Sequence, residues 1–359
     1  MVDSTEIDPR VPRAKLSIDP DAEAISPSTT EASPVSPAGT PTSSAKGDLI
    51  FDSNFECGNL ESATKVSKHE WELRVRGDAH NERHRLWFYF SVRNASKGQK
   101  ALFMMPNMSK GKSSYRDGMS PLVRSKKRST WQRLPAANVI YWKIPRKKCY
   151  CLSFFFEFDD PGDEYFFAYC FPYSYTDLQR YLYTGLELPA YPHCQRELLT
   201  RSPQHRRVDL ITVTSPGTEL APDGALKRRI VLSARIHPGE TPASFMMQGV
   251  LDFLVSDDPR ARHLRDRVVF KIVPMLNPDG VFLGNYRCNS LGYDMNRFWG
   301  NPDARLHPEL LATRTLLLGP RATRTAASAS KAKARAAQAT DNFEGAEQHE
   351  EEEEEEETF

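Results

Sequence analysis

The chain lacks the sequence features of a secreted or membrane-spanning protein. No apolar run in its 359 residues approaches the roughly 18 residues that a membrane span needs. Residues 1–6 have no apolar core of the kind found in a signal peptide. The six cysteines show no framework spacing, so we expect free thiols, including the pair Cys149 and Cys151. These absences predict a cytoplasmic protein with no membrane partner.

Aromatic residues are absent from residues 1–47, which contain seven prolines and many Ser and Thr residues. Such a segment buries too little apolar surface to offset its ordering entropy. Residues 319–359 form a second low-complexity segment, rich first in Ala, Lys and Arg and then in Glu. Blocks of like charge are usually solvated. We therefore expect the chain to be disordered at both ends.

Between these ends the first pattern is that of β-strands. Trp71, Leu73 and Val75 alternate with charged residues, as in a half-buried strand. Residues 86–92 and 152–158 are aromatic-rich runs with strand preference. Short strands with turns between them predict an N-terminal antiparallel β-sandwich over residues 48–178.

From about residue 180 the pattern changes to alternating strands and helices. Residues 208–214, 230–236 and 268–273 are expected strands. A helix is expected to start at Thr241 and Pro242, with an apolar stripe over residues 245–254. This alternation predicts an α/β domain over residues 179–318.

The most informative motif is His-Pro-Gly-Glu at residues 237–240, directly after the expected strand 230–236. Pro at the second position and Gly at the third favour a type II turn with positive φ at Gly239. His237 and Glu240 flank this turn, so their side chains are able to converge on one metal ion. An isolated pair of this kind is more often a simple polar turn, and further segments with matching chemistry are needed.

Two further segments supply that chemistry. The expected strand 268–273 leads to Asn-Pro-Asp-Gly at residues 277–280, which has the residues that a type I turn prefers. Arg287, Asn296 and Arg297 follow shortly afterwards. A guanidinium group binds a carboxylate through two parallel hydrogen bonds and keeps its charge. These residues therefore predict a pocket for a terminal carboxylate beside the turn.

Together these segments resemble the cytosolic carboxypeptidases, a branch of the zinc metallocarboxypeptidases. The resemblance covers about residues 48–318 and extends to the N-terminal part of the branch. It implies a mixed-sheet α/β carboxypeptidase domain after the β-sandwich. The segments that carry it lie at residues 51–60, 115–119, 131–135, 167–173, 237–242, 274–281, 284–288 and 296–297.

The resemblance implies a role for each matching residue. His237 and Glu240 match the first two zinc ligands of the family, so Zn²⁺ is the implied cofactor. Arg287 matches the arginine that stabilises the oxyanion, and Asn296 and Arg297 match the pair that binds the C-terminal carboxylate of the substrate. The implied activity is removal of glutamates from acidic protein tails, including those of tubulin.

The chain departs from the family pattern after residue 318. The third zinc ligand of the family, a His beyond the Asn-Arg pair, has no counterpart, and neither has the catalytic Glu. His307 belongs to a segment that the family shares without using it for zinc, and we expect it to be exposed or to cap a helix. His349 lies in the acidic tail. We therefore expect a truncated carboxypeptidase domain that is inactive as written.

The charge distribution bears on the choice of partner. The formal net charge is +1, and because residues 350–357 contribute −8, the rest of the chain carries +9. Basic clusters at residues 124–128 and 146–148 are ordinary solvated loops or a surface that attracts acidic tails. No nucleic-acid-binding motif accompanies them, so a nucleic-acid partner is not expected. Two functions remain: a zinc carboxypeptidase that acts on acidic tails, and a non-catalytic form that binds such tails or tubulin.

Overall fold

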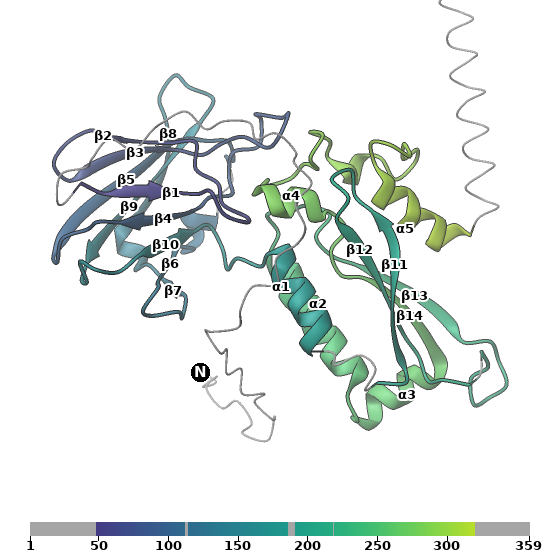
Figure 1. Cartoon of the computed structure of the whole chain (residues 1–359). Helices are drawn as coiled ribbons and strands as arrows, with labels where there is room; N and C mark the ends of the chain where they lie inside the picture. The colour runs from purple at the N-terminus through teal and green to yellow at the C-terminus, as the bar shows by residue number, and fades with distance from the viewer. Residues whose placement is uncertain (1–47, 112–113, 186–190, 218, 320–359) are drawn as a thin grey trace, which may run out of the picture. The chain divides into compact units, whose positions relative to one another are not determined.

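The structure is a computed structural model that describes residues 48–111, 114–185, 191–217 and 219–319. Over these ranges the chain forms three β-sheets and five α-helices (Figure 1). The disorder expected for residues 1–47 and 319–359 falls outside the described residues, except for Gly319, which follows the last helix. In the described ranges no helix is long and apolar enough to cross a membrane.

The first two sheets have five strands each and come from the first half of the chain. One has the order β1 (Ile50–Asp52), β4 (Tyr89–Arg93), β10 (Tyr165–Ala168), β6 (Leu122–Ser125) and β7 (Gln132–Arg133). The other has the order β2 (Ser62–Lys65), β3 (Glu70–Arg74), β5 (Gln99–Met108), β9 (Tyr150–Phe158) and β8 (Val139–Lys143). All pairs are antiparallel except β3 with β5, which is parallel.

Aromatic side chains join these two sheets. Phe90 and Phe167 from one sheet and Phe103 and Phe154 from the other are fully buried. The ring centroids of Phe103 and Phe167 are 5.4 Å apart, and those of Phe103 and Phe154 are 5.3 Å apart. Such contacts stabilise a core beyond the area that they bury. The expected β-sandwich is confirmed, with one parallel pair in an otherwise antiparallel arrangement.

The third sheet is mixed, as expected for the second half of the chain. Its order is β11 (Cys194–Arg201), β12 (Arg207–Val213), β14 (Val268–Val273) and β13 (Arg228–Ser233). β14 pairs antiparallel with β12 and parallel with β13. The helices are α1 (Tyr175–Arg180), α2 (Pro242–Val255), α3 (Pro259–Arg267), α4 (Pro278–Leu283) and α5 (Pro308–Leu318). The fold class is thus confirmed, whereas the domain boundaries at residues 178 and 318 stay predictions.

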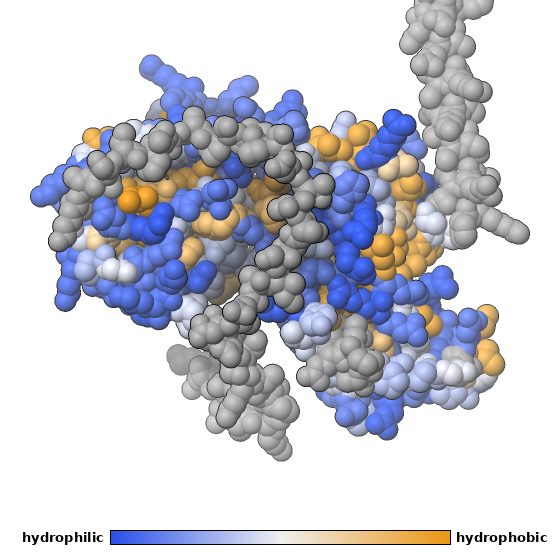
Figure 2. Space-filling view, in the orientation of Figure 1, coloured by the Kyte–Doolittle hydropathy of each residue, from blue (hydrophilic) through white to orange (hydrophobic). Residues whose placement is uncertain are grey.

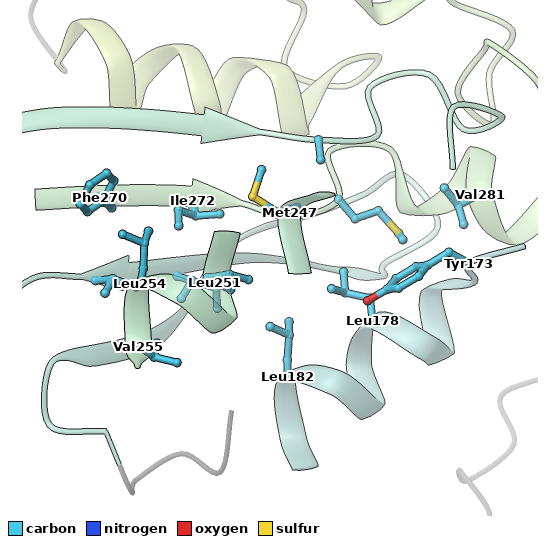
Figure 3. Close-up of a cluster of buried hydrophobic side chains, with 14 of the residues drawn as sticks. Tyr173, Leu178, Leu182, Met247, Leu251, Leu254, Val255, Phe270, Ile272 and Val281 are labelled. Carbon is cyan, nitrogen blue, oxygen red and sulfur yellow. The ribbon is translucent and has the colours of Figure 1, made fainter. Parts of the chain in front are cut away.

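Helix α2 begins at Pro242 as expected, and only part of the expected apolar stripe is buried. Phe245, Met246 and Val250 of that stripe are exposed. The face that packs on the sheet contains Met247, Leu251, Leu254 and Val255, which lie against Phe270 and Ile272 of β14 (Figure 3). Both stripes have helical spacing, because α2 is apolar around most of its circumference. Periodicity alone therefore does not select the buried face.

The helix start also differs from expectation. Thr241 precedes α2, but its side chain makes no capping hydrogen bond. The Thr241 hydroxyl is buried and has no hydrogen-bond partner among the described residues. Pro at the first helical position is the start signal that the structure retains.

Part of the basic cluster at residues 124–128 is paired with acidic side chains of the sandwich. Lys127 and Arg128, from the basic cluster at residues 124–128, form ion pairs of 2.7 Å with Asp160 and Asp159. Arg124 stacks instead over the ring of Phe166. Two of the four basic side chains of this cluster are therefore balanced locally. Figure 2 shows blue, hydrophilic side chains over much of this surface, and an orange apolar patch over the region of α5.

The cysteines are free thiols, as expected from their spacing in the sequence. All six thiols are free, and each is buried except that of Cys149, which is partly exposed.

Candidate active site

The turn at residues 237–240 follows β13, and the side chain of Arg235 holds it through hydrogen bonds. This arginine has a left-handed backbone, with φ of 57°, and its side chain is 3% exposed. Its Nε and Nη2 atoms donate to the carbonyl oxygen of Pro238 at 3.0 and 2.6 Å. Burial lowers the pKa of Arg235 to about 10. The guanidinium therefore remains charged at neutral pH and holds the turn by its central carbonyl.

Gly239 is required in this turn for space and not for positive φ. The expected type II turn is wrong, because Gly239 is not among the glycines with positive φ. A Cβ atom at Gly239 would lie 2.5 Å from Cδ2 of Tyr286 and 3.0 Å from its carbonyl oxygen. The amide of Gly239 donates to that same carbonyl at 2.8 Å. The turn is thus packed directly against the segment that carries Arg287.

The Asn-Pro-Asp-Gly segment begins helix α4 and is not an isolated turn. Asn277 is the N-cap of α4, and its Oδ1 atom accepts from the amide of Gly280 at 3.0 Å. Its Nδ2 atom donates to the carbonyl of Ile236 at 3.2 Å. Pro at the first helical position then continues the helix. The side chain of Asn277 therefore links the start of α4 to the residue before His237.

Both ring nitrogens of His237 face carboxylate oxygens. Nε2 lies 3.1 Å from Oδ1 of Asp294, and Nδ1 lies 3.0 Å from Oε1 of Glu240. When Nε2 carries the proton, it donates a hydrogen bond to Asp294. The lone pair of Nδ1 then points at a second hydrogen-bond acceptor, Oε1 of Glu240. Two acceptors at this distance fit a cation between them, and a carboxylate on the opposite nitrogen is the usual outer partner of a metal-bound His.

The separation of these two atoms also fits zinc. Ligand atoms about 2.1 Å from a tetrahedral zinc ion lie about 3.4 Å from each other. Nδ1 of His237 and Oε1 of Glu240 need to move apart by only a few tenths of an ångström to reach that value. The pair therefore fits two corners of a zinc site. Within the part of the chain that the structure describes, no group of three His, Cys, Asp or Glu residues is placed to hold a metal ion.

Asp294 connects His237, the partner of Glu240, with the two arginines. Its Oδ2 atom accepts from Nε of Arg287 at 2.7 Å and lies 3.7 Å from Nε of Arg297. Its Oδ1 atom accepts from the amide of Asn296 at 3.1 Å as well as facing His237. Burial acts to raise the pKa of Asp294, but the hydrogen bond and charge of Arg287 outweigh it and lower the pKa overall. Asp294 is thus an anion shared by all three predicted functional segments.

The structure brings the five predicted site residues together, and their roles stay predictions. Arg287 is mostly buried, whereas the side chain of Arg297 is 64% exposed and free to meet a ligand. Oδ1 of Asn296 accepts from Nε1 of Trp299 at 2.9 Å, so this side chain is fixed. His307 lies elsewhere. It is the N-cap residue of α5, which is one of the two expected roles, although its side chain makes no capping hydrogen bond. The side chain is buried and stacked on the ring of Phe298, at 4.3 Å between centroids, so the other expected role, an exposed one, is wrong.

Sequence reasoning assigned no role to Asp294 or Lys110. Asp294 stands two residues before Asn296, and that proximity was the available signal. Lys110 follows the sandwich strand β5 by two residues, and its Nζ atom lies 3.3 Å from the hydroxyl of Tyr286. No motif marks it. The hydrogen bond with His237 lowers the pKa of Glu240, and the charges of Arg287 and Lys110 contribute to this effect.

Comparison with known proteins identifies the family. The family model for zinc carboxypeptidases matches residues 189–356, and the model for the cytosolic carboxypeptidase N-terminal domain matches residues 51–155. A metallo-carboxypeptidase from Burkholderia cenocepacia superposes with a TM-score of 0.63 at 30% identity, over 76% of this chain and 68% of that one. The chain therefore belongs to the zinc carboxypeptidase family. Its N-terminal half and its curated relatives assign it to the cytosolic carboxypeptidase branch.

Those relatives include the cytosolic carboxypeptidases 6 of mouse and human. The chain is 49% identical to the mouse protein and 48% identical to the human one, over 76% of its own length in each case. It covers 50% of the mouse protein and 54% of the human protein. The chain thus spans about half the length of the curated relatives that it matches.

Proposed function

We propose that this chain carries the site of a cytoplasmic zinc carboxypeptidase of the deglutamylating type, directed at C-terminal or side-chain glutamates of acidic protein tails such as those of tubulin, and that the polypeptide of residues 1–359 by itself is inactive. One observation carries the proposal: the zinc-ligand pair His237 and Glu240 shares Asp294 with two arginines. A peptide that ends in glutamate presents carboxylates, and guanidinium groups are suited to bind them. The membership of the cytosolic branch supports the same substrate class.

Each residue of the candidate site has its own role in the proposed reaction. Arg297, whose guanidinium is exposed, binds the terminal carboxylate together with Asn296. Arg287, held by Asp294, directs positive charge to the place where an oxyanion develops. Asp294 orients the His237 ring through Nε2, so that Nδ1 faces the metal position. His237 and Glu240 would hold two corners of a zinc site, where the metal would supply Lewis-acid polarisation of the scissile carbonyl. Lys110 adds a further positive charge for an acidic side chain.

A second candidate is a chain that binds acidic tails and does not cut them. The observation that favours it is the ligand set. A catalytic zinc normally has three protein ligands, and the described residues provide two of them beside each other. The carboxylate-binding arginines do not depend on a third ligand. Binding of acidic tails is therefore common to both candidates, and cleavage separates them.

The first prediction separates cleavage from binding. We expect the polypeptide of residues 1–359 to retain well below one equivalent of zinc and to release no glutamate, because the described residues place only two ligands beside each other, and two ligands hold zinc weakly. Metal analysis after desalting and detection of free glutamate from a polyglutamate peptide check this. About one equivalent of zinc, with glutamate release that a chelator abolishes, would contradict the prediction and favour the enzyme.

The second prediction tests the substrate class. We expect Arg297→Ala to weaken binding of a glutamate-terminated peptide at least tenfold, because a charge-assisted hydrogen bond contributes about 1.5–3 kcal/mol. Calorimetric titration with that peptide measures the change. The same peptide ending in glutamines is expected to bind more weakly to the unmodified chain.

The control for this experiment is Arg262→Ala. Arg262 is an exposed arginine on α3, outside the candidate site. Its replacement removes the same charge from the surface and is expected to leave the affinity within about twofold, since exposed charges separated by more than about 10 Å are screened. Equal losses for the two variants would show that net charge, and not the pocket, attracts the peptide.

A further inference from the structure

The segment that carries Arg287 is held by residues of the N-terminal sandwich. Nδ2 of Asn59 donates to the carbonyl of Gly284 at 3.0 Å, and Nη2 of Arg76 donates to that of Leu283 at 2.9 Å. The amide of Ala79 donates to Oδ1 of Asn285 at 3.0 Å. These contacts join parts of the chain that are more than 200 residues apart in sequence.

Asp78 makes the central contact of this set. Its side chain is buried, with 3% exposure, and accepts hydrogen bonds from three successive backbone amides. Oδ1 accepts from the amide of Tyr286 at 2.6 Å, and Oδ2 accepts from those of Arg287 and Cys288 at 2.7 Å each. Hydrogen bonds to a charged acceptor are short and about twice as strong as neutral ones. Three of them on consecutive residues fix the backbone on both sides of Arg287.

The fixed segment then contacts the candidate site in two directions. The side chain of Arg287 reaches Asp294 at 2.7 Å. The carbonyl oxygen of Tyr286 accepts from the amide of Gly239, inside the turn that carries His237 and Glu240. A shift of the backbone at residues 286–288 therefore moves both the arginine and one wall of the zinc-ligand turn.

We propose that Asp78 is a positioning residue for the candidate site. It acts from the N-terminal sandwich, through the backbone of residues 286–288, and places the guanidinium of Arg287 on Asp294. Its importance for catalysis or binding rests on the function proposed above, but the placement of Arg287 does not. The sandwich thus contributes to the organisation of the site as well as to the fold.

A purely structural role for Asp78 makes a different prediction. A residue that only stabilises the fold changes the free energy of unfolding and leaves the native position of Arg287 unaltered. A positioning residue changes the environment of the Arg287 side chain in the folded protein. The readout must therefore report on Arg287 itself under conditions in which the variant is folded.

The experiment uses the full chain with ¹⁵N-labelled arginine and follows the Nε–H signal of Arg287, identified by its absence in Arg287→Lys. In the unmodified protein this proton is hydrogen-bonded to Asp294, and we expect slow exchange with solvent. In Asp78→Asn we expect exchange at least tenfold faster, because one of the two acceptor oxygens becomes an NH2 group, which is a donor and faces backbone N–H groups that are donors too. An unchanged exchange rate in folded Asp78→Asn would overturn the proposal.

Two further variants keep the test decisive. Asp163→Asn is the matched control, because Asp163 is a buried aspartate that accepts from the amides of Lys127 and Glu164 in the sandwich. We expect it to leave the Arg287 exchange rate within twofold. If Asp78→Asn does not fold, Asp78→Ser, whose short hydroxyl also lacks the second acceptor oxygen, is expected to raise the exchange rate as well, and a rate equal to that of the unmodified protein would reject the proposal.

A peptide-binding measurement distinguishes a failure of the positioning proposal from a failure of the proposed function. We expect Asp78→Asn and Arg287→Ala to lower the affinity for a glutamate-terminated peptide by similar factors, and the double variant to show no further loss, because both changes remove the same interaction. Independent, additive losses would contradict positioning. If the unmodified chain does not bind the peptide, the proposed function fails, and the exchange measurement still decides the role of Asp78.

Discussion

Replacement of Gly280 by Ala is expected to destabilise the protein by about 3 kcal/mol, the upper end of the usual range for overpacking. A Cβ atom at this position would lie 2.5 Å from Cγ of Pro238, 2.6 Å from the carbonyl oxygen of Cys288 and 2.8 Å from Oδ1 of Asn277. Real Cβ atoms do not approach other atoms so closely, so one of these groups must move. Each belongs to a different segment of the candidate site, and urea unfolding of Gly280→Ala measures the combined effect.

Gly249→Ala is the matched control. Gly249 also lies in a helix, α2, and a Cβ atom there meets no other atom within 4 Å. Ala is favoured over Gly inside a helix by about 1 kcal/mol. We therefore expect this variant to be slightly more stable than the unmodified protein. Equal effects of the two substitutions would show that Gly280 is not constrained by its neighbours.

The fold was largely predictable because local patterns agreed with it. β14 has the expected bounds, residues 268–273. β12 is displaced by one residue from the expected 208–214, and β13 covers residues 228–233 where 230–236 was expected. Alternation and buried apolar runs identify strands well, but the ends of a strand depend on its neighbours in the sheet.

The candidate site was predictable in its residues and not in its connections. His237, Glu240 and Arg287 were found from the motifs that contain them. Asp294 received no role, because its importance lies in contacts with groups from 57 residues earlier in the chain. The role of Asp78 was not predictable for the same reason, since its partners are 208 to 210 residues away in sequence. A single sequence without an alignment contains no local pattern for such pairs.

Glycine at position 239 is required for a reason other than the one that the sequence suggested. The sequence favoured positive φ, which is a property of the turn alone. The structure shows that the side chain of Tyr286 leaves no space for a Cβ atom. Turn preferences describe residues that are adjacent in sequence, whereas this constraint comes from another segment. A glycine at this position fits either a positive φ or a lack of space for a Cβ atom. The packing against Tyr286 shows that lack of space is the reason.

Glu309 leads to the second prediction of large effect. It lies in the first turn of α5 and its side chain is fully buried. Neither carboxylate oxygen has a hydrogen-bond partner among the described residues. Burial raises the pKa of Glu309 from 4.5 to about 8, and the negative charge of Asp279 adds to this effect. The carboxyl group is therefore protonated in the folded protein at neutral pH.

The sign of the resulting pH dependence follows from proton binding. Between pH 4.5 and 8 the unfolded chain has lost the proton and the folded protein keeps it, so the free energy of unfolding falls as pH rises. The difference of about 3.5 pH units between the two pKa values corresponds to a loss of about 5 kcal/mol, complete above pH 8. His84 and His307 have lowered pKa values, and their contributions change only below pH 6.5.

Glu309→Gln is expected to remove this loss, because glutamine is neutral at every pH. At pH 9 we expect the variant to be more stable than the unmodified protein by several kcal/mol, and at pH 5 nearly equal to it. Urea unfolding from pH 5 to pH 9 measures the difference between the two proteins, in which the histidine contributions cancel. Glu219→Gln, which changes an exposed carboxylate, is expected to follow the unmodified protein at each pH. Parallel curves for Glu309→Gln and the unmodified protein would mean that Glu309 is charged in the folded state, with a partner that stabilises its charge.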